Sequence, residues 1–259
     1  MEKTSWLAHH RKALIWRSTM GAMGVWLLGG CGAPDAPAAA DPVTTTSALT
    51  ECHADNPNPA LFPKNARPFG RSMESWAEQW WRWILSTPAE INPFLHPTMD
   101  SNQNQSGPVV FIVPGDRTNT IPRHKAILVL VTPSTLLNDY PCPDPTFHPA
   151  PGQSLFDFLL ASVLPAQNGV VEVGATLDGQ VLNDLLSYRV VSDDLMYFVG
   201  DLSLQTTLDN CITGSPQPAV VEAFIFMVKP LPPGRHVLTT RVVNSAGQVF
   251  VHTQNLDVQ

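Results

Sequence analysis

The apolar positions between residues 73 and 85 repeat with the period of an α-helix. At about 100° per residue the large apolar side chains fall on one arc, which holds Met73, Trp76, Ala77, Trp80, Trp83 and Ile84. The opposite arc is polar and holds Ser75, Glu78, Gln79 and Arg82. Ser72 is a suitable N-cap, and Pro88 is a stop signal. The pattern predicts an amphipathic helix that packs against the domain through its tryptophans.

After this helix the apolar positions follow the pattern of β-strands, with Val, Ile, Phe and Thr bounded by turn residues. The expected strands are Pro108–Val113, Ala126–Thr132, Val170–Leu177, Tyr188–Ser192, Leu195–Val199, Val220–Val228, His236–Val243 and Val249–Val258. A second helix is expected over Ser154–Leu164. Ser154 and Asp157 resemble a capping box, Pro165 is the stop signal, and apolar residues on most sides indicate burial.

Many strands and few helices favour a mainly β fold over an α/β fold. We expect an antiparallel β-sandwich with an N-terminal amphipathic Trp-rich helix and a second short buried helix. The last two expected strands, joined by a short turn, read as the closing hairpin of this sandwich.

The N-terminal residues have the features of a bacterial export signal. Basic residues precede a short apolar stretch, roughly residues 20–28, which is too short to span a bilayer as a stable helix. The stretch ends in Leu28-Gly29-Gly30-Cys31. This arrangement resembles the lipobox of bacterial lipoproteins, in which the cysteine is acylated and becomes the mature N-terminus. The alternative is an ordinary signal peptide in which Cys31 stands by chance.

The lipobox resemblance implies an order of segments and a location. Residues 1–30 would be the lipoprotein signal peptide, Cys31 the lipidation site, and residues 31–60 an Ala/Pro/Thr-rich tether with too little apolar surface to fold. Residues 61–259 would form the β-sandwich domain. We expect the protein in the bacterial cell envelope, held to the membrane through its N-terminal lipid. Because Gly32 rather than an aspartate follows the cysteine, the outer membrane is expected if the cell has two membranes.

Charge narrows the choice of partners. The formal net charge of −7 becomes −10 once residues 1–30 are removed, because 11 basic and 21 acidic residues remain. An acidic surface repels phosphate backbones, so nucleic acid is not an expected partner. The sequence contains no Gly-rich phosphate loop, and no cofactor is expected. An envelope protein or a glycan is the expected kind of partner.

If Cys31 carries lipid, the number of cysteines left for disulfides is odd, because only Cys52, Cys142 and Cys211 remain. Export places these thiols where disulfides persist. Cys142 and Cys211 both lie in turn-rich segments of the folded part, so we expect them to pair. Cys52, near the end of the tether, would be free or cross-linked, and the other pairings stay open.

Residues 69–240 contain several distinctive strings. They are Trp76-x3-Trp80-Trp81-x-Trp83, Gln105-Ser-Gly-Pro108-Val-x-Phe111, Leu177-Asp-Gly179 and Pro230-Leu-x-Pro-Gly234-x-His236. Together they resemble an uncharacterised family of exported bacterial proteins. The resemblance implies that the helix and the strands form one unit. It transfers no activity, ligand or catalytic residue.

The tryptophans allow two interpretations. A row of indole rings can form a platform for carbohydrate, but three of the four rings share a face with Met73 and Ile84, which favours core packing. Trp81 lies at the edge of the apolar arc and is expected to be partly exposed. If an aromatic residue contacts a ligand, we therefore expect it to be Trp81 or Tyr140.

Two polar segments resemble metal sites in part. The segment Asp100–Gly107 begins as a calcium loop does, but Gln105 stands where a glycine is needed and Phe111 where a bidentate acid is needed. A polar surface loop is favoured. The segment Asp139–His148 offers a thiol, two carboxylates and an imidazole, but its spacing and its prolines favour a stiff loop pinned by a disulfide. No metal ligand is therefore assigned.

Signals for catalysis are weak. The sequence has no G-x-S-x-G motif, and the histidines beyond the signal are scattered at His53, His96, His124, His148, His236 and His252. The last two fall in expected strands, where a hydrogen-bonded sheet histidine is the ordinary explanation. Glu74 and Glu78, one helical turn apart, could act as an acid pair. Arg82 follows on the same face, which favours a solvated charged stripe instead.

The sequence thus predicts a lipid-anchored cell-envelope protein that serves as a non-catalytic binding or surface-structural module. The alternative is an envelope hydrolase that uses a histidine and a carboxylate, or a bound divalent metal. A deep pocket lined by His and Asp or Glu would favour the hydrolase. A grooved aromatic face around Trp81 or Tyr140 would favour binding.

Overall fold

The computed structural model describes residues 57–259 of the chain. The predicted signal peptide, Cys31, Cys52 and most of the predicted tether lie outside the described residues. The chain is already packed at Asn58, whose side-chain nitrogen donates to the Asn183 carbonyl at 2.8 Å, and Leu61 forms a bridge with Val228. Within residues 57–259, every helix falls short of the length and apolar character that a membrane crossing requires.

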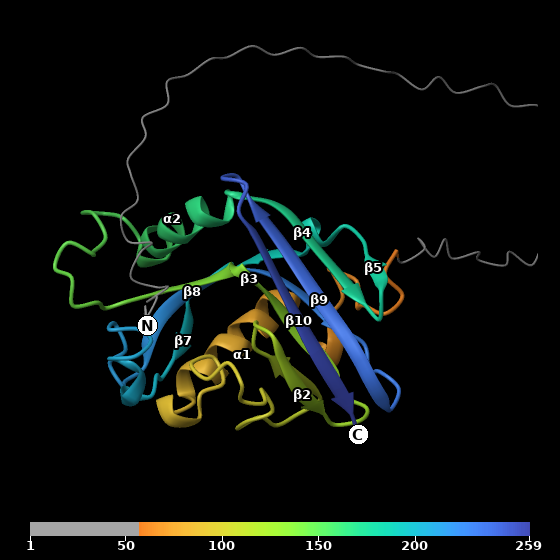
Figure 1. Cartoon of the computed structure of the whole chain (residues 1–259). Coiled ribbons are helices and arrows are strands. Elements are labelled where there is room, and N and C mark those ends of the chain that lie inside the picture. The colour runs from red at the N-terminus through yellow and green to blue at the C-terminus, as the bar shows by residue number, and fades with distance from the viewer. Residues whose placement is uncertain (1–56) are drawn as a thin grey trace, which may run out of the picture. The chain divides into compact units, whose positions relative to one another are not determined.

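The strands form two sheets (Figure 1). Sheet A has the order β1-β3-β8-β6, with β7 also paired to β8. Its strands are β1 (Val109–Ile112), β3 (Ala126–Asp139), β6 (Arg189–Val191), β7 (Met196–Phe198) and β8 (Gln217–Val228). Sheet B has the order β2-β10-β9-β4-β5. Its strands are β2 (Arg117–Ile121), β4 (Val170–Leu177), β5 (Gln180–Leu182), β9 (Gly234–Asn244) and β10 (Val249–Val258). The mainly β, sandwich-like class is confirmed.

The direction of two strand pairs differs from the antiparallel expectation. β1 pairs with β3 in parallel, and β2 pairs with β10 in parallel, whereas the other pairs are antiparallel. The β1–β3 pair is parallel because the chain leaves sheet A after β1, forms β2 in sheet B and returns to sheet A as β3. A period of two shows which side chains share a face, but it carries no information on strand direction.

α1 (Met73–Ser86) packs on the outer face of sheet A (Figure 1). Ser72 caps the helix by accepting a hydrogen bond from the Ser75 N–H at 3.3 Å. Its apolar arc contacts β-strand side chains that include Leu128, Val221 and Ile225. The rings of its tryptophans are at most 6% exposed. The predicted amphipathic helix and its core-facing tryptophans are therefore confirmed.

A second core lies between the two sheets. It combines the residues of β3 and β8 that face away from α1, such as Ile127 and Phe226, with inward residues of sheet B, such as Leu238 and Leu256. All of these side chains are fully buried. The fold thus has three layers, with sheet A between α1 and sheet B (Figure 1). Four 3₁₀-helices connect the elements: Pro68–Gly70, Ala89–Ile91, Leu185–Tyr188 and Leu202–Leu204.

α2 (Leu155–Gln167) covers the part of β8 that sheet B leaves free, on the opposite side of sheet A from α1 (Figure 1). Leu159 and Val163 of this helix pack on Val220. The predicted cap is confirmed, because Ser154 Oγ accepts from the Asp157 N–H at 3.0 Å and donates to the Asp157 carboxylate at 2.6 Å.

Two expectations for this helix are wrong. The sequence predicts an end before Pro165, but Pro165 lies inside the last turn. A proline has no N–H to donate, but Asn168 still donates to the Leu164 carbonyl at 3.1 Å, which closes the turn. The sequence also predicts burial on most sides, whereas Ala161 and Ser162 are exposed. α2 packs on β3 and β8 through one face, so its opposite face meets solvent.

A charged pair lies at the seam between α2 and sheet B. Glu222 is fully buried on β8, and Arg189 of β6 donates to its carboxylate and, at 3.0 Å, to the Asn168 side chain. Burial raises the pKa of Glu222 and outweighs the opposing effect of Arg189. The pair joins strand β8, strand β6 and the end of α2.

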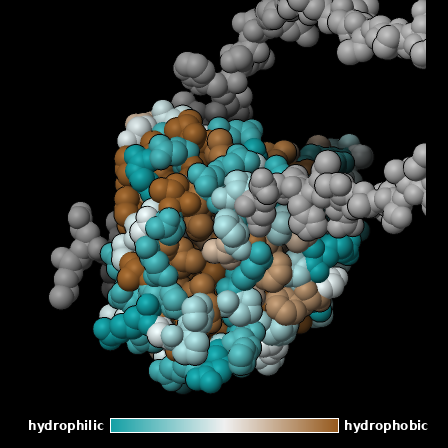
Figure 2. Space-filling model, turned by 90° about the vertical axis from the view of Figure 1, so that its right-hand side faces the viewer, coloured by the Kyte–Doolittle hydropathy of each residue, from teal (hydrophilic) through white to brown (hydrophobic). Residues whose placement is uncertain are grey.

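The outer face of sheet B is exposed and mixed in character. Val181, Val237, Val249 and Val251 are between 41% and 67% exposed. They share this face with polar side chains such as Thr239, which bonds Thr253 at 3.2 Å. Figure 2, seen from the side on which β5 lies, shows hydrophobic residues in a band among hydrophilic ones. Such mixing is typical of a solvated sheet face.

Candidate ligand-binding groove

A groove of about 670 Å³ runs along α1. The helix spans about 15 Å from Trp76 to Ser86, at a rise of 1.5 Å per residue. The groove is lined by α1, by residues 104–108 with Phe111 of β1, and by residues 197–199 with Pro216. Its volume falls in the range of known ligand sites. It is therefore the candidate functional site.

The tryptophans that reach the groove are held from within the protein. The Trp76 indole N–H donates to the Pro68 carbonyl at 3.1 Å, and the Trp83 indole N–H donates to the Gln103 carbonyl at 2.8 Å. Both residues are only 6% exposed. Gln79 and Ser86 continue the same stripe of the helix at spacings of three and four residues. The stripe combines rigid rings with polar groups.

The loop side of the groove is fixed by Gln105. Its side-chain nitrogen donates to the Phe111 carbonyl at 2.8 Å, and its side-chain oxygen accepts from the Phe111 N–H at 2.7 Å. These two hydrogen bonds of the Gln105 side chain take the place of a neighbouring strand on the free edge of β1. Asn104 and Gly107, on either side, have φ of 51° and 94°. The backbone turns back here, which places residues 104–108 beside α1.

The same loop is tied to sheet B by Arg117. This side chain is 8% exposed, and it donates to the carbonyls of Pro93, Met99 and Pro114 at 3.0, 3.1 and 3.2 Å. Burial lowers the pKa of Arg117, while the nearby Asp100 acts to raise it. Arg117 is a structural cation that holds the start of the loop.

The strand side of the groove presents Tyr197. Its side chain is 57% exposed, and its backbone carbonyl accepts from Arg82 Nε at 2.9 Å. Arg82 also pairs with Glu78, one turn earlier on α1, at 3.2 Å. Burial raises the pKa of Glu78, Arg82 opposes this, and the carboxylates of Asp193 and Asp194 raise it further. Arg82 therefore links α1 to β7 and orients the strand that carries Tyr197.

The lining of the groove combines neutral polar groups, guanidinium groups and aromatic rings. Among the described side chains that line it, none is a carboxylate, an imidazole or a thiol. The polar groups are amides, hydroxyls and guanidinium groups, and the large apolar groups are aromatic. Amides and guanidinium groups donate hydrogen bonds to neutral oxygens, while aromatic rings offer flat apolar surface. Among the described lining residues, the phenol of Tyr197 is the one group that commonly takes part in general acid–base catalysis.

The expected exposure of Trp81 is wrong. Its side chain is only 5% exposed, because its ring packs 5.2 Å from Trp80 and 6.4 Å from Phe94, measured between ring centroids. Phe94 belongs to the segment after α1, which folds back over this edge of the helix. Tyr140 is half-buried and packs with Phe147 beneath α2. Neither Trp81 nor Tyr140 lines the groove.

The segment that begins like a calcium loop has a structural role. The two carboxylate oxygens of Asp100 accept from the Asn102 and Thr120 N–H groups, each at 2.9 Å. Ser101 is fully buried, its N–H donates to the Asn119 side chain at 3.1 Å, and its hydroxyl accepts from the Val113 N–H at 3.0 Å. The expectation of a polar surface loop is therefore confirmed for Gln103, Asn104 and Ser106, which are exposed. Asp100 and Ser101 instead anchor the loop.

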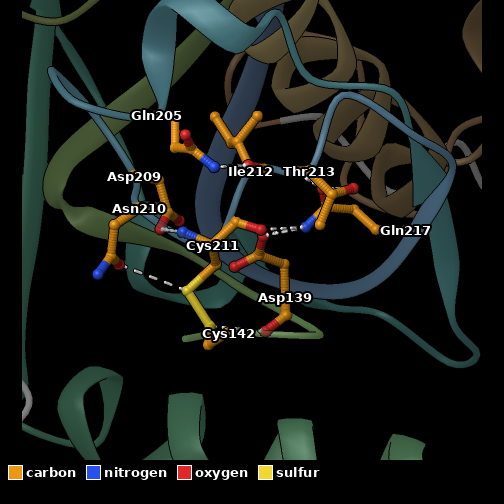
Figure 3. Close-up of a disulfide and its surroundings, with 9 residues drawn as sticks. All are labelled: Asp139, Cys142, Gln205, Asp209, Asn210, Cys211, Ile212, Thr213 and Gln217. Atoms are coloured by element: carbon orange, nitrogen blue, oxygen red, sulfur yellow. Dashed lines mark hydrogen bonds between the residues drawn. A yellow bond between two sulfur atoms is a disulfide. The ribbon is translucent and has the colours of Figure 1, made fainter. Parts of the chain in front are cut away.

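The predicted disulfide between Cys142 and Cys211 is confirmed (Figure 3). It joins segments 69 residues apart, with 4.3 Å between the Cα atoms. Beside it, Gln217 donates to the Asp139 carboxylate at 2.6 Å and to the Cys211 carbonyl at 3.1 Å. The bridge therefore fixes the segment that leads to Pro216, which lines the groove.

The metal-like segment does not converge on one point. Asp139, Cys142 and Cys211 have potential ligand atoms within 4.8 Å of one another, but both sulfurs are used in the disulfide. The carboxylate of Asp144 accepts from Thr146 instead, and His148 Nδ1 lies 3.0 Å from the Pro149 carbonyl. The expectation of a stiff, disulfide-pinned loop fits this arrangement.

The predicted sheet histidine is confirmed at His236. Its Nδ1 lies 2.7 Å from the Asp178 carboxylate and its Nε2 3.0 Å from the Pro232 carbonyl. Burial acts to lower the pKa of His236, but these two acceptors outweigh it and the pKa is raised. When the imidazole is protonated, both ring nitrogens donate to these acceptors. His252 Nδ1 is 4.0 Å from Asp116.

The groove residues that the sequence interpretation missed are Gln79, Asn104 and Tyr197. For Tyr197 a signal was present, because Met196-Tyr197-Phe198-Val199 alternates within an expected strand. In the structure Met196 and Phe198 are buried, whereas Tyr197 and Val199 are exposed. A large aromatic on the outward side of such a strand marks an accessible ring. For Asn104 no comparable signal exists, since its position depends on the fold of the loop.

No family model matches the chain, and no curated protein matches it. Among solved structures, the chain has a partial similarity to the solution structure of amebosin. The TM-score is 0.20 at 10% identity, and the match covers 58% of this chain and 96% of that chain. A similarity at this level carries no argument about fold or function.

Proposed function

We propose that this chain is a lipid-anchored cell-envelope protein whose folded part is a non-catalytic module that binds a glycan. The proposal for the anchor rests on Leu28-Gly29-Gly30-Cys31 and the basic and apolar residues that precede it. The proposal for the glycan rests on one observation, the groove along α1. Its lining combines an exposed aromatic ring, Tyr197, with amides and hydroxyls.

The hydrolase alternative gains no support from the groove, because its described lining lacks the imidazole and carboxylate on which that alternative depends. The His236–Asp178 pair is the closest approach to a histidine–carboxylate device among residues 57–259. Its imidazole has both nitrogens engaged, so it lacks the free nitrogen that a general base needs.

Binding can be tested by titrating the full-length chain with a panel of oligosaccharides in a detergent without a sugar headgroup. We expect wild type to bind at least one of them. We expect Tyr197→Ala to weaken that binding by about tenfold or more, as for a central aromatic contact. Tyr197→Phe should retain most of the affinity because the ring remains. The matched control is Leu186→Ala, which removes a 44% exposed apolar side chain outside the groove.

Two outcomes would overturn the glycan proposal. One is the absence of binding to every oligosaccharide, and the other is unchanged affinity in Tyr197→Ala. The anchor is tested separately by metabolic labelling with a radioactive fatty acid. We expect label on wild type and none on Cys31→Ser. Equal labelling of the two chains would exclude Cys31 as the lipidation site.

A further inference from the structure

The groove contains two arginines, but one of them has a compensated charge. Arg82 Nη2 pairs with Glu78 at 3.2 Å, and Arg82 Nε donates to the Tyr197 carbonyl at 2.9 Å. The pair is only partly exposed, with 31% of the Arg82 side chain and 18% of the Glu78 side chain accessible. A paired carboxylate at this distance cancels most of the field that Arg82 would present to a ligand. The Arg82–Glu78 pair thus supplies hydrogen-bond donors to the groove with little net charge.

Arg71 contributes the other cation. Its guanidinium carbon lies 5.7 Å from the centroid of the Trp76 ring, in the geometry of a cation–π contact. The side chain is exposed at the end of the groove where α1 begins. Water and salt screen such a charge more than a buried one.

The surroundings of the groove are acidic. Asp193 and Asp194 are exposed and act electrostatically on Glu78, and the chain as a whole has a formal net charge of −7. A polyanion approaching this surface is repelled by the general field. Apart from Arg71 at its end, the groove therefore presents local hydrogen-bonding groups without an attractive positive field.

The remaining polar contacts are uncharged. Gln79 and Asn104 offer both donors and acceptors, and Ser86 and Ser106 offer hydroxyls. Paired donors and acceptors match the hydroxyl groups of a sugar, each of which can also donate and accept. The groove is open and follows α1 for about 15 Å, so it suits an extended chain rather than a single sugar.

We infer that the groove accepts an extended, electrically neutral sugar chain and discriminates against acidic sugar chains. Glu78 is the specificity-determining residue, since it cancels the charge of Arg82. This inference rests on the proposed glycan-binding function and deepens it by naming the ligand class.

The first test compares neutral and acidic ligands on the full-length chain by isothermal titration calorimetry. The probes are chitohexaose and xylohexaose, which are neutral, and hexagalacturonate, which is acidic. We expect one of the neutral sugars to bind about tenfold more tightly than hexagalacturonate at low salt. We expect its affinity to change by less than about twofold when salt is raised, because screening affects only charged partners. Tighter binding of hexagalacturonate, weakened by salt, would overturn the inference.

The second test removes the compensating charge. Glu78→Gln keeps the size of the side chain and an oxygen that can accept from Arg82, but leaves the arginine charge uncompensated. We expect the affinity for hexagalacturonate to rise about fivefold at low salt and to return to the wild-type value at high salt. Glu90→Gln is the matched control, since it makes the same change of net charge at an exposed position outside the groove. Thermal unfolding of both variants verifies that they are folded.

The outcomes separate the two proposals. If Glu78→Gln is folded and hexagalacturonate binding does not rise above that of Glu90→Gln, charge compensation is not the basis of selectivity, and the inference fails. If wild type binds only hexagalacturonate, the inference fails while the glycan-binding function stands. If wild type binds none of the three probes or any other sugar of the panel, both proposals fail.

Discussion

Trp80 provides a direct test of whether the tryptophans of α1 hold the fold or serve a ligand. Its side chain is fully buried, and its indole N–H donates to the Ile112 carbonyl of β1 at 3.1 Å. Its ring lies 5.2 Å from Trp81 and 6.0 Å from Phe94, measured between centroids. Trp80→Ala therefore removes a large buried ring between helix and sheet and leaves a buried carbonyl without its donor.

The expected loss of stability is about 3–5 kcal/mol, the range for replacing a buried aromatic by alanine. For a folded part of about 200 residues, each kcal/mol lowers the melting temperature by about 2–4 °C. The melting temperature should then fall by roughly 6–20 °C. Trp80→Phe keeps most of the ring but not the N–H, so it should cost about 1–3 kcal/mol from the unsatisfied carbonyl.

Calorimetry and urea unfolding of the full-length chain measure these changes. Leu186→Ala, at an exposed position on the 3₁₀-helix Leu185–Tyr188, is the control and should stay within about 0.5 kcal/mol of wild type. Glycan binding is measured on each variant at a temperature where it is folded. If Trp80→Ala leaves the unfolding free energy within about 1 kcal/mol of wild type and abolishes binding, the assignment of this helix to the core is refuted.

Three further changes test the framework around the groove. The pKa of His236 is raised above 6.5, and that of Asp178 is lowered below 3.8. The interaction between the two side chains is therefore fully present between pH 3.8 and pH 6.5. It is lost as the pH rises through the raised pKa of His236. His236→Gln should therefore destabilise the protein at about pH 6, and in urea unfolding the difference from wild type should shrink toward about pH 9; a difference independent of pH would contradict this. Replacing Cys142 and Cys211 by serine should cost about 2–5 kcal/mol in the same measurement, and an unchanged stability would show that the bridge constrains nothing. Ser154→Ala should cost about 0.5–2 kcal/mol through the lost cap of α2, whereas an increase in melting temperature would rule out that cap.

The elements with a strong period were predictable from the sequence. α1 was identified because its large apolar side chains fall on one arc with a cap before them. The closing hairpin of β9 and β10 was identified because its strands alternate and a short turn joins them. The Cys142–Cys211 pair was identified because both cysteines lie in loops of the folded part. In these cases local chemistry and the tertiary environment favour the same structure.

β2 was missed for a physical reason. Its inward side chains include Arg117 and Asn119, which are buried and polar. They are tolerated because Arg117 meets backbone carbonyls and Asn119 donates to the Gln254 side chain at 2.7 Å. This segment lacks apolar alternation, since the burial of its polar groups depends on tertiary partners: carbonyls up to 24 residues away for Arg117, and a side chain 135 residues away for Asn119.

The candidate site was predictable only in its general character. The sequence predicts an exposed aromatic residue, but at Trp81 rather than at Tyr197, and the binding role stays a prediction. Exposure at the edge of a helix depends on what packs there, and Phe94 covers Trp81. The groove itself is made by three segments that meet only in the fold. A single sequence contains no local signal that these segments lie side by side in the fold.

The place of β10 inside sheet B has a consequence for the order of folding. β10 lies between β2 and β9, and its contact with β2 includes the Asn119–Gln254 hydrogen bond, across 135 residues of chain. β2 therefore has no partner strand until β10 has been synthesised, and loop closure over such a length slows folding. A nascent chain with this topology stays open while most of it is made. That delay suits a protein that, as we propose, crosses a membrane before it folds.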